Sequence, residues 1–170
     1  VYCFSLPNFI CVILNIPIVI CTVGNPGVSV LQASLAAYAP QCSVFLWRVK
    51  RTTFGESYND AMEDAFRSHD EIIISNDDVV LTPTTISVLL EDVSNLRKEH
   101  GDKLGFVATL TDNARAEQNI RIAKEGVVRK ERVIAPLFAW VSKKAFEAAV
   151  HGSFNAILFG ILKSGNRNFR

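Results

Sequence analysis

Short, continuously apolar runs are spaced along the chain, and each of them predicts a strand. Residues 16–22 are apolar and rich in β-branched side chains, which is typical of a strand buried on both faces of a parallel sheet. The segment 72–81 begins with three isoleucines, which are followed by polar residues at 75–78, so we expect a buried central strand there. Further extended segments are expected at residues 43–49, 104–110, 127–134 and 137–141.

Between these runs the apolar residues recur every three or four positions, which predicts helices. The first helix should be capped by Asn25 and should have Pro26 at its first position, because both residue types are favoured there. The second should begin at Ser57, and the third should start at Pro83 and stop at Gly101. Residues 114–124 are expected to be helical or irregular, and a last helix capped by Ser142 should run to residue 150.

This alternation of strands and helices predicts an α/β fold of Rossmann-like type, with a mostly parallel sheet and helices on both faces. We expect one domain over residues 16–170, preceded by an N-terminal extension of uncertain role at 1–15. Ligands of such sheets bind beyond the carboxyl ends of the strands. Residues 22–25, 48–50 and 76–78 should therefore converge.

Composition narrows the class of protein. The chain is 49% hydrophobic and 21% charged with a net charge of +1, so a packed domain is expected and a nucleic acid partner is not. Four cysteines without metal-ligand spacing and three histidines argue against a zinc site. We expect buried, reduced thiols in a cytoplasmic protein.

The first 23 residues carry no charge, which raises the question of a membrane span. Pro7 and Pro17 interrupt the run, no basic residue precedes it, and its last third is better used as a strand. Membrane association is therefore not expected.

The strongest chemical signal lies where the central strand ends, at Asn76, Asp77 and Asp78. Two adjacent carboxylates repel each other, and a divalent cation that prefers oxygen ligands, Mn²⁺ or Mg²⁺, would relieve that repulsion. The alternative is a plain turn before a helix, because Asn and Asp are favoured in turns and caps. The motif alone leaves both open.

Three motifs follow one another in the first half of the chain. They are Thr-Val-Gly-Asn at 22–25, Phe-Gly-Glu-Ser-Tyr-Asn at 54–59, and Ile-Ser-Asn-Asp-Asp-Val-Val-Leu-Thr-Pro at 74–83. In this order they resemble the nucleotide-sugar-binding half of family 2 glycosyltransferases. The resemblance covers residues 16–93 well and continues weakly to residue 154.

The resemblance implies the GT-A fold, with a nucleotide-sugar-binding half at 16–100 and a shortened acceptor-side half at 101–170. Asn76 and Asp78 match the family's Asp-x-Asp signature, so an amide replaces the first acid. Asp78 would be the metal ligand, and Asp77 would face the ribose or the water shell of the metal. The other residues implied in donor binding are Thr22, Val23 and Gly24 beside the nucleobase and ribose, and Gly55 and Asn59 under the nucleotide.

The sequence departs from the family pattern in two further places. Trp47, Arg48 and Val49 stand where the family often has an acid that recognises the base, which weakens the case for uridine. The family's general base follows a segment resembling residues 137–146, but no acidic residue occurs after Glu147. The chain is shortened or altered there, or the base lies elsewhere, or the domain binds its donor and transfers poorly. The catalytic residue is thus left unknown, with His151 as a minor candidate.

The sequence therefore predicts transfer of a hexose from a UDP-type donor to an unknown acceptor, with donor hydrolysis as a further outcome. One rival is a nucleotidyltransferase, although residues 23–27 lack the basic loop that it would need. The other is a non-catalytic nucleotide-binding or interaction domain of doubly wound type. Trp140 is expected in the core, and Lys50, Arg51 and Glu147 are expected in solvent.

Overall fold

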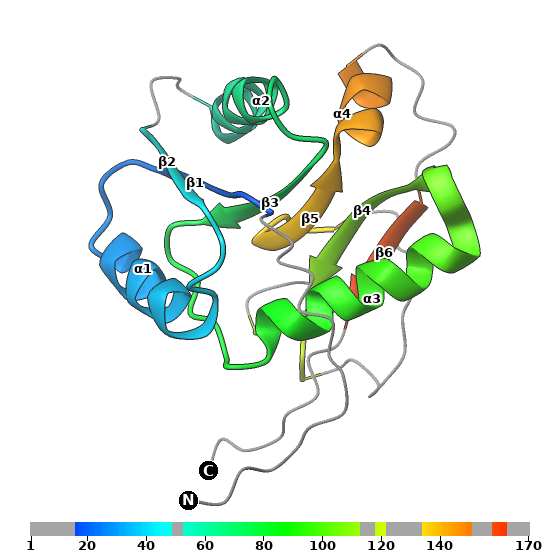
Figure 1. The fold of residues 1–170 in the computed structure, drawn as a ribbon. Helices are drawn as coiled ribbons and strands as arrows, with labels where there is room; N and C mark the ends of the chain where they lie inside the picture. Colours follow the sequence, from blue (N-terminus) through cyan, green and yellow to red (C-terminus); the bar gives the residue numbers. More distant parts are fainter. Residues whose placement is uncertain (1–15, 49–52, 113–117, 122–133, 151–157, 163–170) are drawn as a thin grey trace, which may run out of the picture.

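The computed structural model describes residues 16–48, 53–112, 118–121, 134–150 and 158–162, with side chains for all of these except 54, 149–150 and 158–162. Within these residues the chain forms one sheet in the order β2-β1-β3-β5-β4-β6 (Figure 1). The strands are β1 (Ile18–Thr22), β2 (Val44–Arg48), β3 (Glu71–Asn76), β4 (Leu104–Thr109), β5 (Phe138–Ser142) and β6 (Leu158–Leu162).

The sheet is mixed, with three parallel and two antiparallel pairings among the described strands, so the mostly parallel sheet that the sequence predicts is found only in part. β1 pairs in parallel with β2 and with β3, and β4 pairs in parallel with β6. β5 is inserted between β3 and β4 and runs antiparallel to both. The carboxyl ends of β2, β1 and β3 therefore meet at one edge of the sheet.

Helices cover both faces of the sheet, which confirms the expected α/β architecture (Figure 1). α1 (Gly27–Tyr38) and α3 (Thr85–His100) pack on one face, and α2 (Phe54–Ala65) and α4 (Lys143–Val150) pack on the other. A short 3-10 helix, η1 (Gly101–Lys103), joins α3 to β4. In the described part of the chain, no helix is long and apolar enough to cross a membrane.

Side chains of β1 alternate between two hydrophobic cores. Ile18 and Ile20 belong to the core beneath α1 and α3, whereas Val19 and Cys21 belong to the core beneath α2. All five residues of β1 are buried, as expected for a strand with helices on both sides. The described cysteines, Cys21 and Cys42, are free thiols.

The edge strand β2 differs from this pattern. Val44, Phe45 and Leu46 are 40%, 46% and 48% exposed, because β2 has a partner strand on one side only among the described residues. An apolar sequence thus marks the strand correctly but does not distinguish an edge strand from a central one.

Three helices begin at positions other than those predicted, and one of them is α3, which starts at Thr85 instead of Pro83. α2 starts three residues before Ser57, at Phe54, because Thr53 and Glu56 form a capping box. In that box the Thr53 hydroxyl oxygen accepts a hydrogen bond from the Glu56 N–H at 3.3 Å, and the Thr53 hydroxyl donates to the Glu56 carboxylate at 2.8 Å. α1 starts at Gly27 with Pro26 as its N-cap residue, so Pro26 does not occupy the first helical position and Asn25 is not the cap.

Two further predicted helix ends are confirmed, and other predicted segments lie outside the described residues. The start of α4 after Ser142 is confirmed, and the Ser142 hydroxyl oxygen accepts a hydrogen bond from the Ala145 N–H at 3.2 Å. The end of α3 at Gly101 is confirmed as well. The predicted segments at 114–117 and 127–133 lie outside the described residues, as do Cys3 and Cys11.

The burial of α3 side chains in the core leads to a prediction about the stability of a variant. Leu89→Ala should lower the free energy of unfolding by about 2–5 kcal/mol, because Leu89 is 1% exposed and its removal leaves a cavity. The matched change Leu46→Ala on the exposed edge strand should cost only about 0.5 kcal/mol. Urea denaturation followed by circular dichroism measures both, and equal losses would contradict this description of the core.

Candidate functional site

The carboxyl ends of three parallel strands place polar residues side by side. In the strand register Thr22 of β1 lies opposite Arg48 of β2, and Cys21 of β1 lies opposite Asn76 of β3. The residues that follow β1 and β3 therefore leave the sheet next to each other. The predicted convergence is confirmed for residues 22–25, 48 and 76–78, whereas residues 49–50 lie outside the described part of the chain.

A hydrogen-bond chain joins the two strand ends. The Thr22 hydroxyl donates to the Asp77 carboxylate at 2.6 Å, and the Gly24 N–H donates to the Thr22 hydroxyl oxygen at 2.9 Å. Gly24 has φ +92°, a backbone conformation that side chains with a Cβ disfavour. The loop after β1 is thus folded back onto the threonine that holds Asp77.

The start of α1 lies directly against the loop that carries the two carboxylates. A Cβ on Gly27 would lie 3.0 Å from the Asp77 carbonyl oxygen and 3.2 Å from the Asp78 Cα, so only glycine allows this approach without a shift. The Asn25 side chain accepts a hydrogen bond from the Gly27 N–H at 3.0 Å and fixes the turn into the helix. The positive end of the α1 dipole is therefore close to the loop that carries the two acids.

Tyr58 contributes to the site from beneath, and the sequence pattern missed it. Its hydroxyl lies 2.7 Å from the Ser75 carbonyl oxygen and 2.9 Å from Asn76 Oδ1. Burial raises the pKa of Tyr58 well above its ordinary range, and the nearby Cys21, Asp77 and Asp78 raise it further. The phenol therefore stays protonated. Helical periodicity marked Tyr58 only as an apolar-face residue, and no signal in the sequence pointed to its hydroxyl.

Cys21 lies beneath the same strand end. Burial raises the pKa of this thiol to about 12, and the charge of Asp77 adds to the shift. The thiol donates a hydrogen bond to the Ser57 carbonyl oxygen at 3.7 Å. Since the thiolate is the reactive form, Cys21 is an inert core residue at neutral pH.

The donor set suits a divalent cation that keeps most of its shell from water and ligand phosphates. Asp77 is half-buried and Asp78 is exposed, and Asn76 adds an amide at the same strand end. Among the described residues, no group of three or more His, Cys, Asp or Glu side chains could enclose a metal ion. Mg²⁺ is typically held by one or two carboxylates plus substrate phosphates, and the oxygen groups present here fit that pattern.

The remaining predicted site residues are exposed or lie outside the described part of the chain. Val23 is 82% exposed beside Gly24. Gly55 and Asn59 occupy exposed positions on α2, and a Cβ on Gly55 would meet nothing within 4 Å. The structure therefore gives no steric reason for a glycine at position 55. Lys50, Arg51 and His151 lie outside the described residues, as does Val49.

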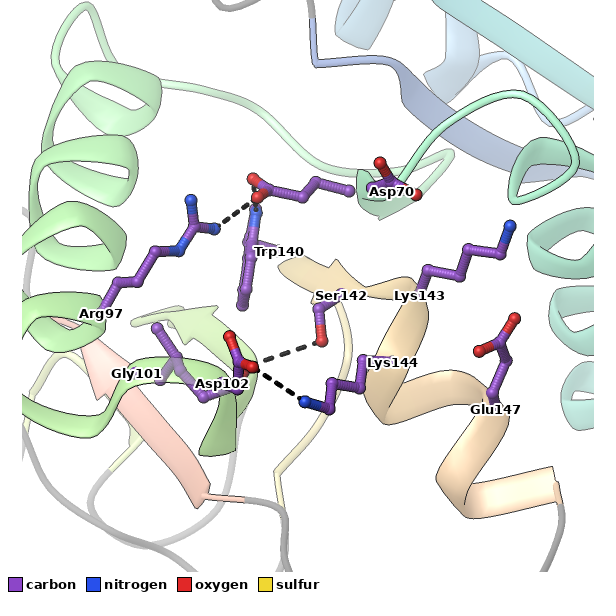
Figure 2. A pocket seen from close by; sticks show the side chains of 11 residues that line it. Asp70, Arg97, Gly101, Asp102, Trp140, Ser142, Lys143, Lys144 and Glu147 are labelled. Atoms are coloured by element: carbon purple, nitrogen blue, oxygen red, sulfur yellow. Dashed lines mark hydrogen bonds and ion pairs between the residues drawn. The ribbon is translucent and has the colours of Figure 1, made fainter.

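A separate pocket of about 610 Å³ opens at the opposite end of the sheet, between α3 and α4 (Figure 2). Its walls include the first residue of β3 and the last residue of β5, so it lies at the amino ends of the parallel strands. Glu147 is exposed in this pocket, which confirms it as a solvated residue. Trp140 lines the pocket but is 1% exposed, so the expected core position is confirmed.

The charges in this second pocket largely neutralise each other. Arg97 pairs with the Glu71 carboxylate, which also accepts a hydrogen bond from Trp140 Nε1 at 3.1 Å. Lys144 pairs with Asp102 at 3.0 Å. The strand-end cluster at Asn76, Asp77 and Asp78 is therefore the better candidate for ligand chemistry.

Comparisons with known proteins support the fold and leave the chemistry open. No protein-family model and no curated protein matches the chain in sequence. The solved structure of A197 from STIV is similar with a TM-score of 0.60 at 8% identity, over 89% of this chain and 83% of A197. S. aureus TarS 1–349 is similar with a TM-score of 0.52 at 12% identity, over 89% of this chain and 59% of the TarS structure. At these identities the likeness shows a shared α/β fold, and this chain spans less than two thirds of TarS 1–349.

The Thr22 contact makes a prediction about stability. Thr22→Val keeps the shape of the side chain but removes the hydroxyl that donates to Asp77, so the free energy of unfolding should fall by about 1–3 kcal/mol. The same change at Thr84, whose buried hydroxyl has no hydrogen-bond partner among the described residues, should cost about 0.5 kcal/mol or less. Urea titrations of both variants test this, and an equal loss would remove the structural role assigned to Thr22.

Proposed function

We propose that this chain is a glycosyltransferase domain of GT-A type that binds a nucleotide-diphosphate sugar with Mn²⁺ or Mg²⁺ at the carboxyl ends of β1 and β3. The observation that carries the proposal is the attachment of Asp77 to Thr22, which sets two neighbouring carboxylates beside the loop after β1. The three motifs of the first half support it. The fold shared with TarS, a glycosyltransferase, supports it further.

The exposure of each residue suggests its part in donor binding. Asp78 is exposed, so we assign it as the protein ligand of the metal. Asp77 is held by Thr22 and would face the ribose or the metal's water shell. Val23 and Gly24 would flank the nucleoside at the end of β1. When bound, the cation would neutralise charge on the departing nucleoside diphosphate.

The proposed transfer of the sugar to an acceptor has less support than the proposed binding of the donor. Glu147, the last acidic residue of the sequence, lines the pocket at the opposite end of the sheet and is too distant to serve this site as a base. Transfer would need a general base from elsewhere, and water is a simpler acceptor than a sugar hydroxyl. We therefore include slow hydrolysis of the donor in the proposal, and a donor-hydrolysis assay separates an enzyme from a nucleotide-binding domain without activity.

Donor binding should depend on Asp78. Calorimetric titration of UDP and of GDP, each with Mn²⁺, should give binding to the wild-type chain. Asp78→Ala should weaken binding by more than the roughly 10–100-fold that is typical of losing an outer-shell partner of a metal. Asp64→Ala is the matched control, because Asp64 is an exposed carboxylate that pairs with Arg67 near the end of α2, and it should bind like the wild type.

Two results would defeat the proposal. One is the failure of both nucleotides to bind the wild-type chain in the presence of metal. The other is binding that Asp78→Ala leaves unchanged. A preference for GDP over UDP would keep the site but replace the predicted uridine donor, in line with Arg48 at the end of β2.

A further inference from the structure

The number of hydrogen-bond donors and acceptors around the Tyr58 hydroxyl determines which end of the Asn76 amide faces it. A tyrosine hydroxyl has one hydrogen to donate, and its oxygen can also accept. The hydroxyl lies 2.7 Å from the Ser75 carbonyl oxygen, which can only accept, so the hydrogen must point there. No hydrogen is then left for the second neighbour, the Asn76 amide at 2.9 Å.

An oxygen of Asn76 facing Tyr58 would therefore meet the lone pairs of another oxygen. The two ends of an asparagine amide have nearly the same size and shape, so the hydrogen-bond network determines which end faces a partner. With the amide turned over, its NH₂ group donates to the Tyr58 oxygen, so the contact joins a donor to an acceptor. Tyr58 is 4% exposed, so water cannot easily supply the missing hydrogen instead.

We infer that Tyr58 is a positioning residue that holds the Asn76 amide with its NH₂ group inward and its oxygen turned away toward the carboxyl end of β3. This inference rests on the proposed function for its consequence, since an outward oxygen at position 76 adds a neutral, hard ligand beside Asp77 and Asp78. The amide thereby substitutes for a carboxylate at this position without adding a third negative charge. An outward NH₂ group would instead repel a cation.

The orientation itself can be measured without any ligand. In ¹⁵N–¹H spectra of the free protein, the Asn76 side-chain signals are identified by their absence in Asn76→Ala. In Tyr58→Phe, which removes the acceptor oxygen, the NH₂ proton that is hydrogen-bonded to it should move upfield and the other NH₂ proton should move less. Both should stay in place in Tyr38→Phe, an exposed tyrosine on α1. Two Asn76 protons that shift together, or that do not respond to Tyr58→Phe, would overturn the inference.

The consequence is measured by binding. Tyr58→Phe should weaken Mn²⁺ binding in the presence of nucleotide by about tenfold, as is typical of outer-shell partners, while nucleotide binding without metal stays unchanged. Tyr38→Phe should match the wild type in both titrations. A merely structural effect of Tyr58→Phe would lower both binding steps together, and that result, or no change in the metal step, would overturn the inference.

Variants of Asn76 test the same point without touching the core. Asn76→Asp keeps an oxygen facing outward and should retain Mn²⁺ binding, whereas Asn76→Ala should lose about tenfold. An equal loss in both variants would mean that the outward group is the NH₂. If the wild-type chain binds nucleotide and metal but these variants fail the prediction, only the inference falls. If the wild-type chain binds neither, the metal role falls with the proposed function, while the spectra still decide the orientation.

Discussion

The parallel pairing of β1 with β3 is the constraint on which the rest of the structure depends. Both strands are buried by helices on two faces, so their backbone groups must be satisfied within the sheet and their register is fixed. With Cys21 opposite Asn76, the next residues on each strand, Thr22 and Asp77, come within hydrogen-bond distance. The site is thus an outcome of core packing, and a one-residue slip would move every one of its side chains to the wrong face.

Burial also separates the chemistry of the site into two levels. Beneath the strand ends, Cys21 and Tyr58 are held neutral because their surroundings disfavour charge. Above them, the Asp77 side chain is half-buried and the Asp78 side chain is exposed to water. Neutral groups below and charged groups above give the edge of the sheet a surface that favours cations, while the phenol and amide below it set the geometry.

The sequence predicted the parts of the fold that follow from local patterns. The apolar run at 16–22 identified β1, and the polar residues after the isoleucines marked the exit of β3. The start of α2 was missed because the Thr53 capping box precedes the apolar periodicity. The antiparallel direction of β5 and the contact made by the Tyr58 hydroxyl depend on pairings between distant segments, which no local pattern records.

The insertion of β5 also has a consequence for the order of folding. β1, β2 and β3 with their two connecting helices are complete once residue 76 has been made, whereas β5 must return from residues 138–142 to pair with β3. The pairing of β3 with β5 therefore cannot form until residues 138–142 have been synthesised. We expect the strand-end cluster to assemble as an early folding unit during synthesis, with one flank of β3 unpaired until the second half of the chain arrives.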